Sequence, residues 1–200
     1  MLKKQLEQYV QKKISESPNK NQVALHKEEK EFSQKHGLLE GNFQIEELDP
    51  QQRFENAYIE RGNKETEELI AQETKEFLEQ PISYFKKHKN EFMYMESEWW
   101  ELIGADAVSF EKDDVFGTYD VMLGLKLQKK YEAAIRRYLS EHLNGEESTY
   151  DLMFDANEGL WSLNFSFDDL PGFDEELTIG DAYSKIYTFL FNLAESVETN

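Results

Sequence analysis

Carboxylate side chains are most concentrated near the end of the chain, between Asp168 and Glu176. Residues 151–200 contain 11 acidic residues and one basic residue, Lys185. Such a surface attracts a basic protein partner and orients its approach. Alternatively, these acids form a solvated loop and stabilise the N-terminus of the next helix. We expect partner binding by one tryptophan and five acids: Trp100, Asp168, Asp169, Asp174, Glu175 and Glu176.

A second candidate site surrounds Trp99-Trp100. Neighbouring side chains on a helix diverge by about 100°, so both rings cannot face the same core. Trp99 continues the apolar stripe of a helix expected over residues 90–103, and Trp100 lies either under another element or at a pocket or interface. A carboxylate near an aromatic ring can be tuned for acid–base chemistry. An enzyme with a carboxylate site near Trp99-Trp100 and Asp113-Asp114 is therefore a second hypothesis.

Local motifs of common catalytic and metal sites are absent from the sequence. Without Cys there are no disulfides, thiolate nucleophiles or Cys-ligated metals. The four His residues show no metal-binding spacing, and GxSxG, GxGxxG and GxxxxGKS/T do not occur. Asp155, Asn157 and Gly159 match the start of a calcium loop, but Ser166 replaces the acid expected at the end of that loop. We expect no metal and no cofactor, and a hairpin turn at this position.

The net charge of −19, from 41 acidic and 22 basic residues, limits the partner classes. A polyanion repels nucleic-acid backbones and anionic membrane surfaces, so we expect neither as a partner. The chain lacks an apolar run of membrane-spanning length and the apolar core of a signal peptide. A cytoplasmic location is therefore the expectation, and solubility by itself is the alternative explanation of the charge.

The clearest structural pattern is a hairpin between Tyr150 and Asp169. Apolar and polar residues alternate over 160–168 and, more briefly, over 150–155, which is typical of half-buried strands. The linker between them is short and ends in Gly159, as in an antiparallel hairpin. The Trp161-Leu163-Phe165 side is expected to face the core.

The segments around this hairpin predict further elements of the second half. Residues 119–128 fit a strand or a helix, and Gly124 favours the strand. A helix over 129–143, closed by Asn144-Gly145, is expected next. Thr178 and Asp181 form a capping-box variant that opens a last helix with a wide apolar face. The order is β-α-β-β-α.

Helical periodicity dominates the first half. The expected helices span residues 2–16, 22–36, 50–61, 64–79 and 90–103, and a connector over 38–48 can hold a short strand at 43–45. We therefore predict an α+β fold with a two-layer antiparallel sheet of about three to five strands packed by helices, and a mostly helical N-terminal half. The regions are 1–104 and 105–200, either as two parts or as one continuous domain.

Five stretches, spread over most of the chain, carry a resemblance to a protein family. They are ETEEL (65–69), LEQPI (78–82), YMESEW (94–99), DDVFGTYD (113–120) and GLW (159–161). On these residues the chain resembles a family of short, uncharacterised bacterial proteins, some of which carry the automatic label branched-chain amino acid aminotransferase. The label implies a pyridoxal cofactor bound to a lysine. Lys126, Lys129 and Lys130 lie near the expected strand-to-helix junction, but no glycine-rich phosphate loop follows, so we assign no catalytic residue.

Three functional hypotheses follow from these patterns. The first is a non-catalytic, acidic, cytoplasmic interaction protein, inhibitor-like, immunity-like or regulatory, with a basic protein partner. The second is a small enzyme with a carboxylate site, or an aminotransferase-related protein. The third is a structural homo-oligomer, such as a homodimer held by its N-terminal helices.

Overall fold

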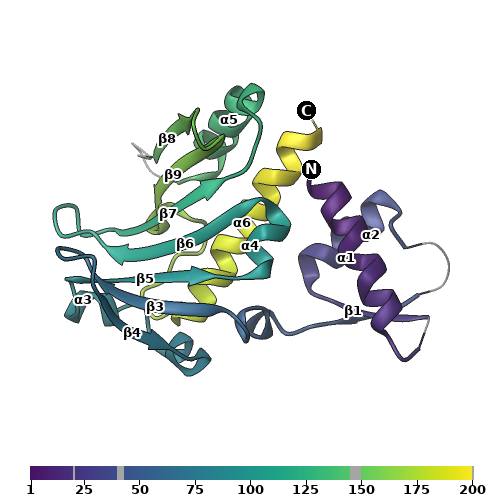
Figure 1. Cartoon of the computed structure of the whole chain (residues 1–200), viewed down its shortest axis with the longest axis horizontal. Helices are drawn as coiled ribbons and strands as arrows, with labels where there is room; N and C mark the ends of the chain where they lie inside the picture. The colour runs from purple at the N-terminus through teal and green to yellow at the C-terminus, as the bar shows by residue number, and fades with distance from the viewer. Residues whose placement is uncertain (20, 40–42, 145–149, 200) are drawn as a thin grey trace.

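The centre of the molecule is a large antiparallel sheet (Figure 1). The computed structural model describes residues 1–19, 21–39, 43–144 and 150–199, and within these residues the sheet has seven strands in the order β4-β3-β5-β6-β7-β9-β8. The strands are β3 (Tyr58–Asn63), β4 (Leu69–Glu73), β5 (Glu91–Glu96), β6 (Ala105–Lys112), β7 (Tyr119–Leu125), β8 (Tyr150–Asp155) and β9 (Leu160–Ser166). The predicted α+β class is confirmed.

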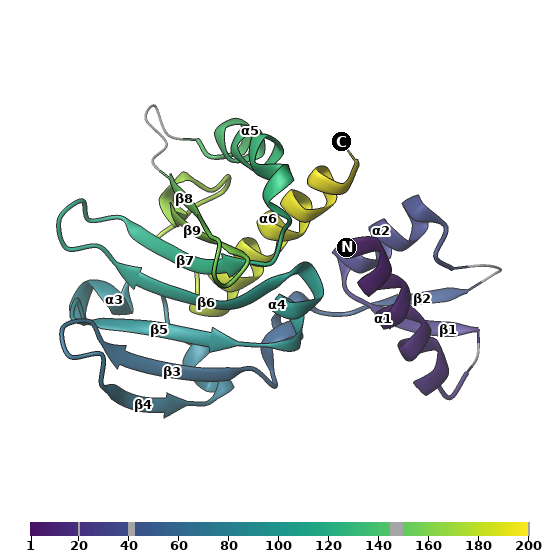
Figure 2. The ribbon, with the colours of Figure 1, turned by 45° about the horizontal axis from the view of Figure 1, so that its top comes forward.

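One face of this sheet carries the main core. It packs against α5 (Glu132–His142) and α6 (Ile179–Thr199), which lie on the same side of the sheet (Figure 2). Side chains in register across the strands form continuous buried rows, for example Ile59, Met95, Val108, Leu123, Leu163 and Leu152. The opposite face is bordered at its end by α4 (Glu98–Ile103), and no helix of the described residues covers it (Figure 1).

The elements predicted for the second half are confirmed. β8 and β9 form the hairpin, with Trp161 buried and Ser162 exposed on the other face. Residues 119–125 are the strand β7, and the helix α5 follows. At the start of α6, the Asp181 amide donates to Thr178 Oγ1 at 3.1 Å and the Thr178 amide donates to Asp181 Oδ2 at 3.3 Å, as a capping box requires. Gly145 lies outside the described residues.

Three helices predicted in the first half are wrong. The spans 50–61, 64–79 and 90–103 instead contain β3, β4 and β5, and their helical parts are short. Phe92 to Glu96 alternates as a strand does, and pairing with β3 and β6 bonds its backbone on both sides. The sheet is consequently larger than predicted, and the first half is not mostly helical. The short helices are η1 (Pro50–Phe54), η2 (Lys75–Glu79), α3 (Tyr84–Lys87), η3 (Lys129–Tyr131) and η4 (Phe167–Asp169).

Residues 1–47, here called the N-terminal segment, form a smaller unit beside the large sheet (Figures 1 and 2). The predicted helix over 2–16 is confirmed as α1 (Leu2–Glu16). The helix predicted over 22–36 divides into β1 (Gln22–Leu25) and α2 (Lys27–His36), and β1 pairs in parallel with β2 (Gln44–Glu47). Because β5 pairs with β6 across residue 104, both predicted regions contribute strands to the large sheet.

A buried ion cluster joins the N-terminal segment to the rest of the chain. Arg53 of η1 donates to Glu29 Oε1 at 2.8 Å and to Glu28 Oε2 at 2.7 Å, both on α2. The Tyr187 hydroxyl of α6 donates to the same Glu29 oxygen at 2.6 Å. The Arg53 guanidinium lies 3.7 Å from the ring centre of Tyr187 and 4.6 Å from that of Trp99. The cluster therefore links α2, η1, α4 and α6 through one cation.

Candidate functional site

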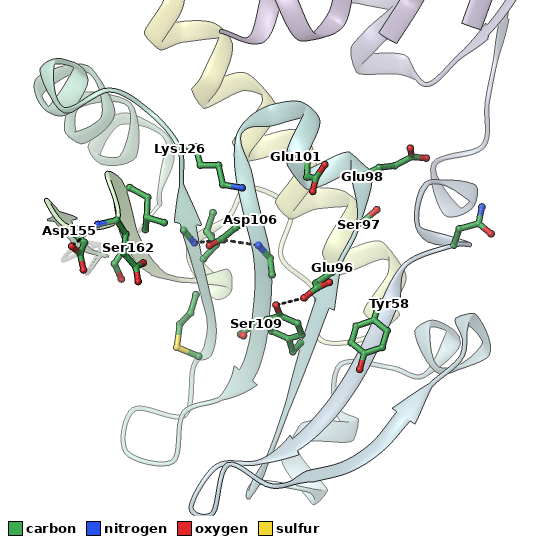
Figure 3. Close-up of a pocket in the computed structure, with 18 residues that line it drawn as sticks. Tyr58, Glu96, Ser97, Glu98, Glu101, Asp106, Ser109, Lys126, Asp155 and Ser162 are labelled. Carbon is green, nitrogen blue, oxygen red and sulfur yellow. Dashed lines mark hydrogen bonds between the residues drawn. The ribbon is translucent and has the colours of Figure 1, made fainter. Parts of the chain in front are cut away.

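The uncovered face of the sheet is hollowed into a groove of about 860 Å³, here called the open-face groove (Figure 3). β3, β5 and α4 form one wall, the β8–β9 hairpin forms the other, and β6 and β7 form the floor. Small residues line the floor, namely Ala107 in the β6 bulge and the register pair Gly124 and Ser162. The side chains that carry its chemistry are Tyr58, Tyr94, Glu96, Glu98, Glu101, Asp106, Lys126 and Asp155.

A β-bulge places Asp106 on the floor of this groove. The register between β6 and β7 shifts between Ala105 and Val108. Asp106 Oδ1 accepts the backbone N–H of Ala107 at 2.7 Å and that of Gly124 at 2.8 Å (Figure 3). A Cβ atom on Gly124 would lie 2.4 Å from Asp106 Oδ2, so the carboxylate occupies the space that a side chain would need. Bulges often re-aim a side chain in this way beside functional sites.

Two tyrosines and two glutamates alternate on the wall formed by β3 and β5. Tyr58 stands opposite Glu96, and Glu60 stands opposite Tyr94. The Tyr94 hydroxyl donates to Glu96 Oε1 at 2.7 Å, and the Tyr58 hydroxyl donates to Glu60 Oε1. Burial, and then the bond to Glu96, raise the pKa of Tyr94 to about 12, so this phenol keeps its proton at neutral pH. These four residues are called the Tyr–Glu square below.

The carboxylates of the groove form no ion pairs within the part of the chain that the structure describes. Among the ion pairs of the described residues, none includes Glu96, Glu98 or Glu101. Lys126 is the one basic side chain among the described lining residues. A concave surface lined by one sign of charge concentrates the field and attracts ligands of the opposite sign. The groove is therefore suited to a cationic ligand or a basic protein surface.

A second cleft, of about 800 Å³, lies between α2, α5 and α6. Its acids and bases are mixed, and some are already paired with one another. Lys35 lies 2.8 Å from Glu195 Oε1, and Arg53 lies 2.7 Å from Glu28 Oε2. The mixed charge of this second cleft therefore does not favour one class of partner. The acidic open-face groove, in contrast, favours cationic ligands or basic protein surfaces.

The prediction that Trp100 contacts a partner is corrected by its burial. The ring is fully buried and stacks on Phe54 with ring centres 4.9 Å apart. It also packs against Tyr183 and Tyr187 of α6. Because α4 lies between α6 and the N-terminal segment, both Trp99 and Trp100 find apolar cover on different sides of this short helix.

The five predicted acids lie near the start of β7, away from the floor residue Gly124. Asp168 Oδ2 accepts the backbone N–H of Tyr119 at 2.6 Å. Glu175 forms an ion pair with Lys86, so part of this acidic stretch makes contacts within the chain. The half-buried acids are Asp168 and Asp169, and the exposed acids are Asp174, Glu175 and Glu176. Partner binding by these acids stays a prediction.

The carboxylate site suggested near Trp99-Trp100 and Asp113-Asp114 is not assembled. The first pair precedes β6 and the second follows it. At about 3.3 Å per residue, the strand separates them by roughly 25 Å. Asp113 Oδ1 instead accepts the backbone N–H groups of Val115 and Phe116 in the β6–β7 turn.

Within the described ranges, no group of three or more His, Cys, Asp or Glu side chains is placed to hold a metal ion. In the same part of the chain, no helix combines the length and the apolar character needed to cross a bilayer.

The sequence does contain a pattern that predicts the Tyr–Glu square, but the helices predicted over 50–61 and 90–103 left it unrecognised. Tyr58-Ile59-Glu60 and Tyr94-Met95-Glu96 share the spacing polar–apolar–polar. In a strand this spacing puts Tyr and Glu on one face and the apolar residue on the other. Asp106 offered no comparable pattern, because its position depends on a bulge between two strands.

Comparisons of the chain with protein-family models, with curated proteins and with solved structures found no match.

Proposed function

We propose that this chain is a non-catalytic interaction module that binds a basic protein partner through the open-face groove. The observation that carries the proposal is the combination of an uncovered, concave sheet face with carboxylates that form no ion pair among the described residues. Interfaces of this kind gain association rate and partner selectivity from complementary charge.

The net charge of −19 supports the same partner class. It repels acidic proteins and nucleic acids while it steers a basic protein toward the acidic groove. An inhibitor-like, immunity-like or regulatory role in the cytoplasm agrees with such a partner and stays part of the proposal. The enzyme hypothesis has no comparable support, since its two segments lie at opposite ends of β6.

A charge-matched pair of triple variants tests where the basic partner binds. The groove variant carries Glu96→Gln, Glu98→Gln and Glu101→Gln, and the control carries Asp174→Asn, Glu175→Gln and Glu176→Gln. The probe is a lysine- and arginine-rich peptide, titrated by calorimetry at low and at physiological salt. Each exposed ion pair contributes about 0.2–1 kcal/mol, so the groove variant should bind about tenfold more weakly.

The control variant should bind within about twofold of the unmodified protein, because it changes the net charge equally but at another place. If the control variant loses affinity and the groove variant does not, the docking surface is the stretch from Asp168 to Glu176. Equal losses in both variants would show unspecific attraction by the total charge.

A further inference from the structure

We propose that the Tyr–Glu square receives an arginine side chain of the partner. This inference rests on the proposed function and deepens it, because it names the side chain that the groove recognises. The evidence is a comparison within the chain, where similar sets of tyrosine and glutamate hold arginines at two other places.

The first internal example is the cluster around Arg53. Its guanidinium is bound by two carboxylates, Glu28 and Glu29, and lies against the rings of Tyr187 and Trp99. The Tyr187 hydroxyl donates to Glu29 at 2.6 Å, so tyrosine and glutamate act as one unit. Two acids and two rings thus surround one guanidinium.

The second example is Arg61 on β3. Its Nε donates to Glu73 Oε1 at 2.6 Å, and its Nη1 donates to Glu91 Oε2 at 2.7 Å. The Tyr84 hydroxyl donates to the same Glu91 oxygen at 2.9 Å and accepts from Arg61 Nη1 at 2.8 Å. The guanidinium carbon lies 5.2 Å from the ring centre of Phe77 and 5.8 Å from that of Tyr84.

The Tyr–Glu square has the same parts without the cation. Each tyrosine hydroxyl donates to a glutamate, as Tyr187 and Tyr84 do. Among the described residues, no cation or ring packs on Tyr58 or Tyr94, and no base pairs with Glu60 or Glu96. Tyr58 is 38% exposed, and Figure 3 shows Tyr58 and Glu96 projecting from neighbouring strands. Glu96 is exposed as well, and Glu60 and Tyr94 are partly exposed, so a side chain of a partner can contact the square from solvent.

The arrangement of the square favours arginine over lysine. In the antiparallel register, Glu60 and Glu96 stand at diagonal corners, which are about 7–8 Å apart in such pairs. A guanidinium presents five N–H donors in a plane and can contact acceptors on two sides while it stacks on a ring. A lysine ammonium is a compact charge and reaches one corner at a time.

Two short peptides of equal charge test this inference. One is a glycine–serine peptide with two arginines, and the other has lysines at the same positions. We expect the arginine peptide to bind the full chain about tenfold more tightly, because stacking on the rings of Tyr58 and Tyr94 adds to the charge attraction. The ring-proton resonances of Tyr58 and Tyr94 should shift during the arginine titration and much less with lysine.

A ring-deleting variant supplies the decisive comparison. With Tyr58→Leu and Tyr94→Leu, the preference for arginine should fall below about twofold, while the thermal unfolding midpoint confirms that the chain is folded. Tyr58→Phe and Tyr94→Phe keep the rings and should preserve most of the preference. Equal binding of both peptides to the unmodified chain, or an arginine preference that survives in the leucine variant, would overturn the arginine site and leave the proposed function intact. Binding of neither peptide would overturn both.

Discussion

Glu29 illustrates how strongly one buried charge depends on its partners. Its side chain has no exposed surface, and Arg53 beside it is 3% exposed. Arg53 and Tyr187 both donate to its carboxylate. Without Glu29, the buried guanidinium would keep Glu28 as its remaining carboxylate partner and lose part of its compensation for leaving water.

We therefore expect Glu29→Ala to lower the free energy of unfolding by about 3 kcal/mol or more. Urea denaturation monitored by tryptophan fluorescence measures this change. Glu47→Ala removes an exposed ion pair with Lys30 and serves as the control, with an expected change below about 1 kcal/mol. Similar changes in the two variants would contradict the structural role assigned to Glu29.

The bulge between β6 and β7 arises from the pairing of the two strands, and the sequence of either strand alone does not predict it. Asp106 folds its carboxylate over Gly124 because an extra residue on β6 leaves two backbone N–H groups facing it. The absence of a side chain at Gly124 is thus a requirement of close packing, since the nearest Asp106 oxygen would lie 2.4 Å from a Cβ.

Gly124→Ala should accordingly destabilise the protein by about 1–3 kcal/mol. Removing the obstructing carboxylate as well, in Gly124→Ala with Asp106→Ala, should cost less than the sum of the single changes, with a coupling of about 0.5–3 kcal/mol. Ser162→Ala, on the exposed neighbouring position of β9, is the control, with an expected effect within about 0.5 kcal/mol. Additive effects would show that the two residues do not compete for space.

At the scale of the whole molecule, the N-terminal segment packs against α4, and His26 lies in that contact. It is 2% exposed, and its ring meets Trp99 edge-on with centres 4.9 Å apart. Burial, and next the charge of Arg53, lower the pKa of His26 to about 4. The contact between the two parts therefore requires a neutral imidazole.

This requirement predicts acid sensitivity above the range of the carboxylates. An unfolded chain binds a proton at His26 with a pKa of about 6.5, whereas the folded chain does so near pH 4. Between these values the unfolded state holds more protons, so the free energy of unfolding falls as the pH decreases. From pH 7.5 to 4.5 the loss should be about 2 kcal/mol.

Urea denaturation of the unmodified chain and of His26→Gln at both pH values measures this contribution. Carboxylates with lowered pKa, such as Glu91 and Glu195, titrate in both proteins and therefore cancel. The variant should lose about 2 kcal/mol less over the interval. Parallel losses would mean that His26 titrates in the folded protein as it does in the unfolded chain.

The local sequence pattern was sufficient to predict a helix or strand where it fitted only one type of secondary structure. Alternation over 160–168 predicted β9, and the stripe of α1 predicted its helix, because burial of one face imposes a single period on each. The apolar residues of the segment 91–96 fit both the spacing of a helix and the alternation of a strand. Pairing with β3 and β6 decided for the strand, and no window of the sequence contains that pairing.

The sequence by itself determined the acidic charge, the lack of Cys-based chemistry and the hairpin at the end of the large sheet. Tertiary structure decided which acids stay free, because cations from distant segments neutralise some of them. Glu73 on β4 and Glu91 on β5 meet Arg61 because both strands pair with β3, whereas Glu96 stands on the uncovered face and forms no ion pair among the described residues. Whether a carboxylate is paired within the chain therefore depends on which strands and side chains lie beside it, and these neighbours come from residues far apart in the sequence.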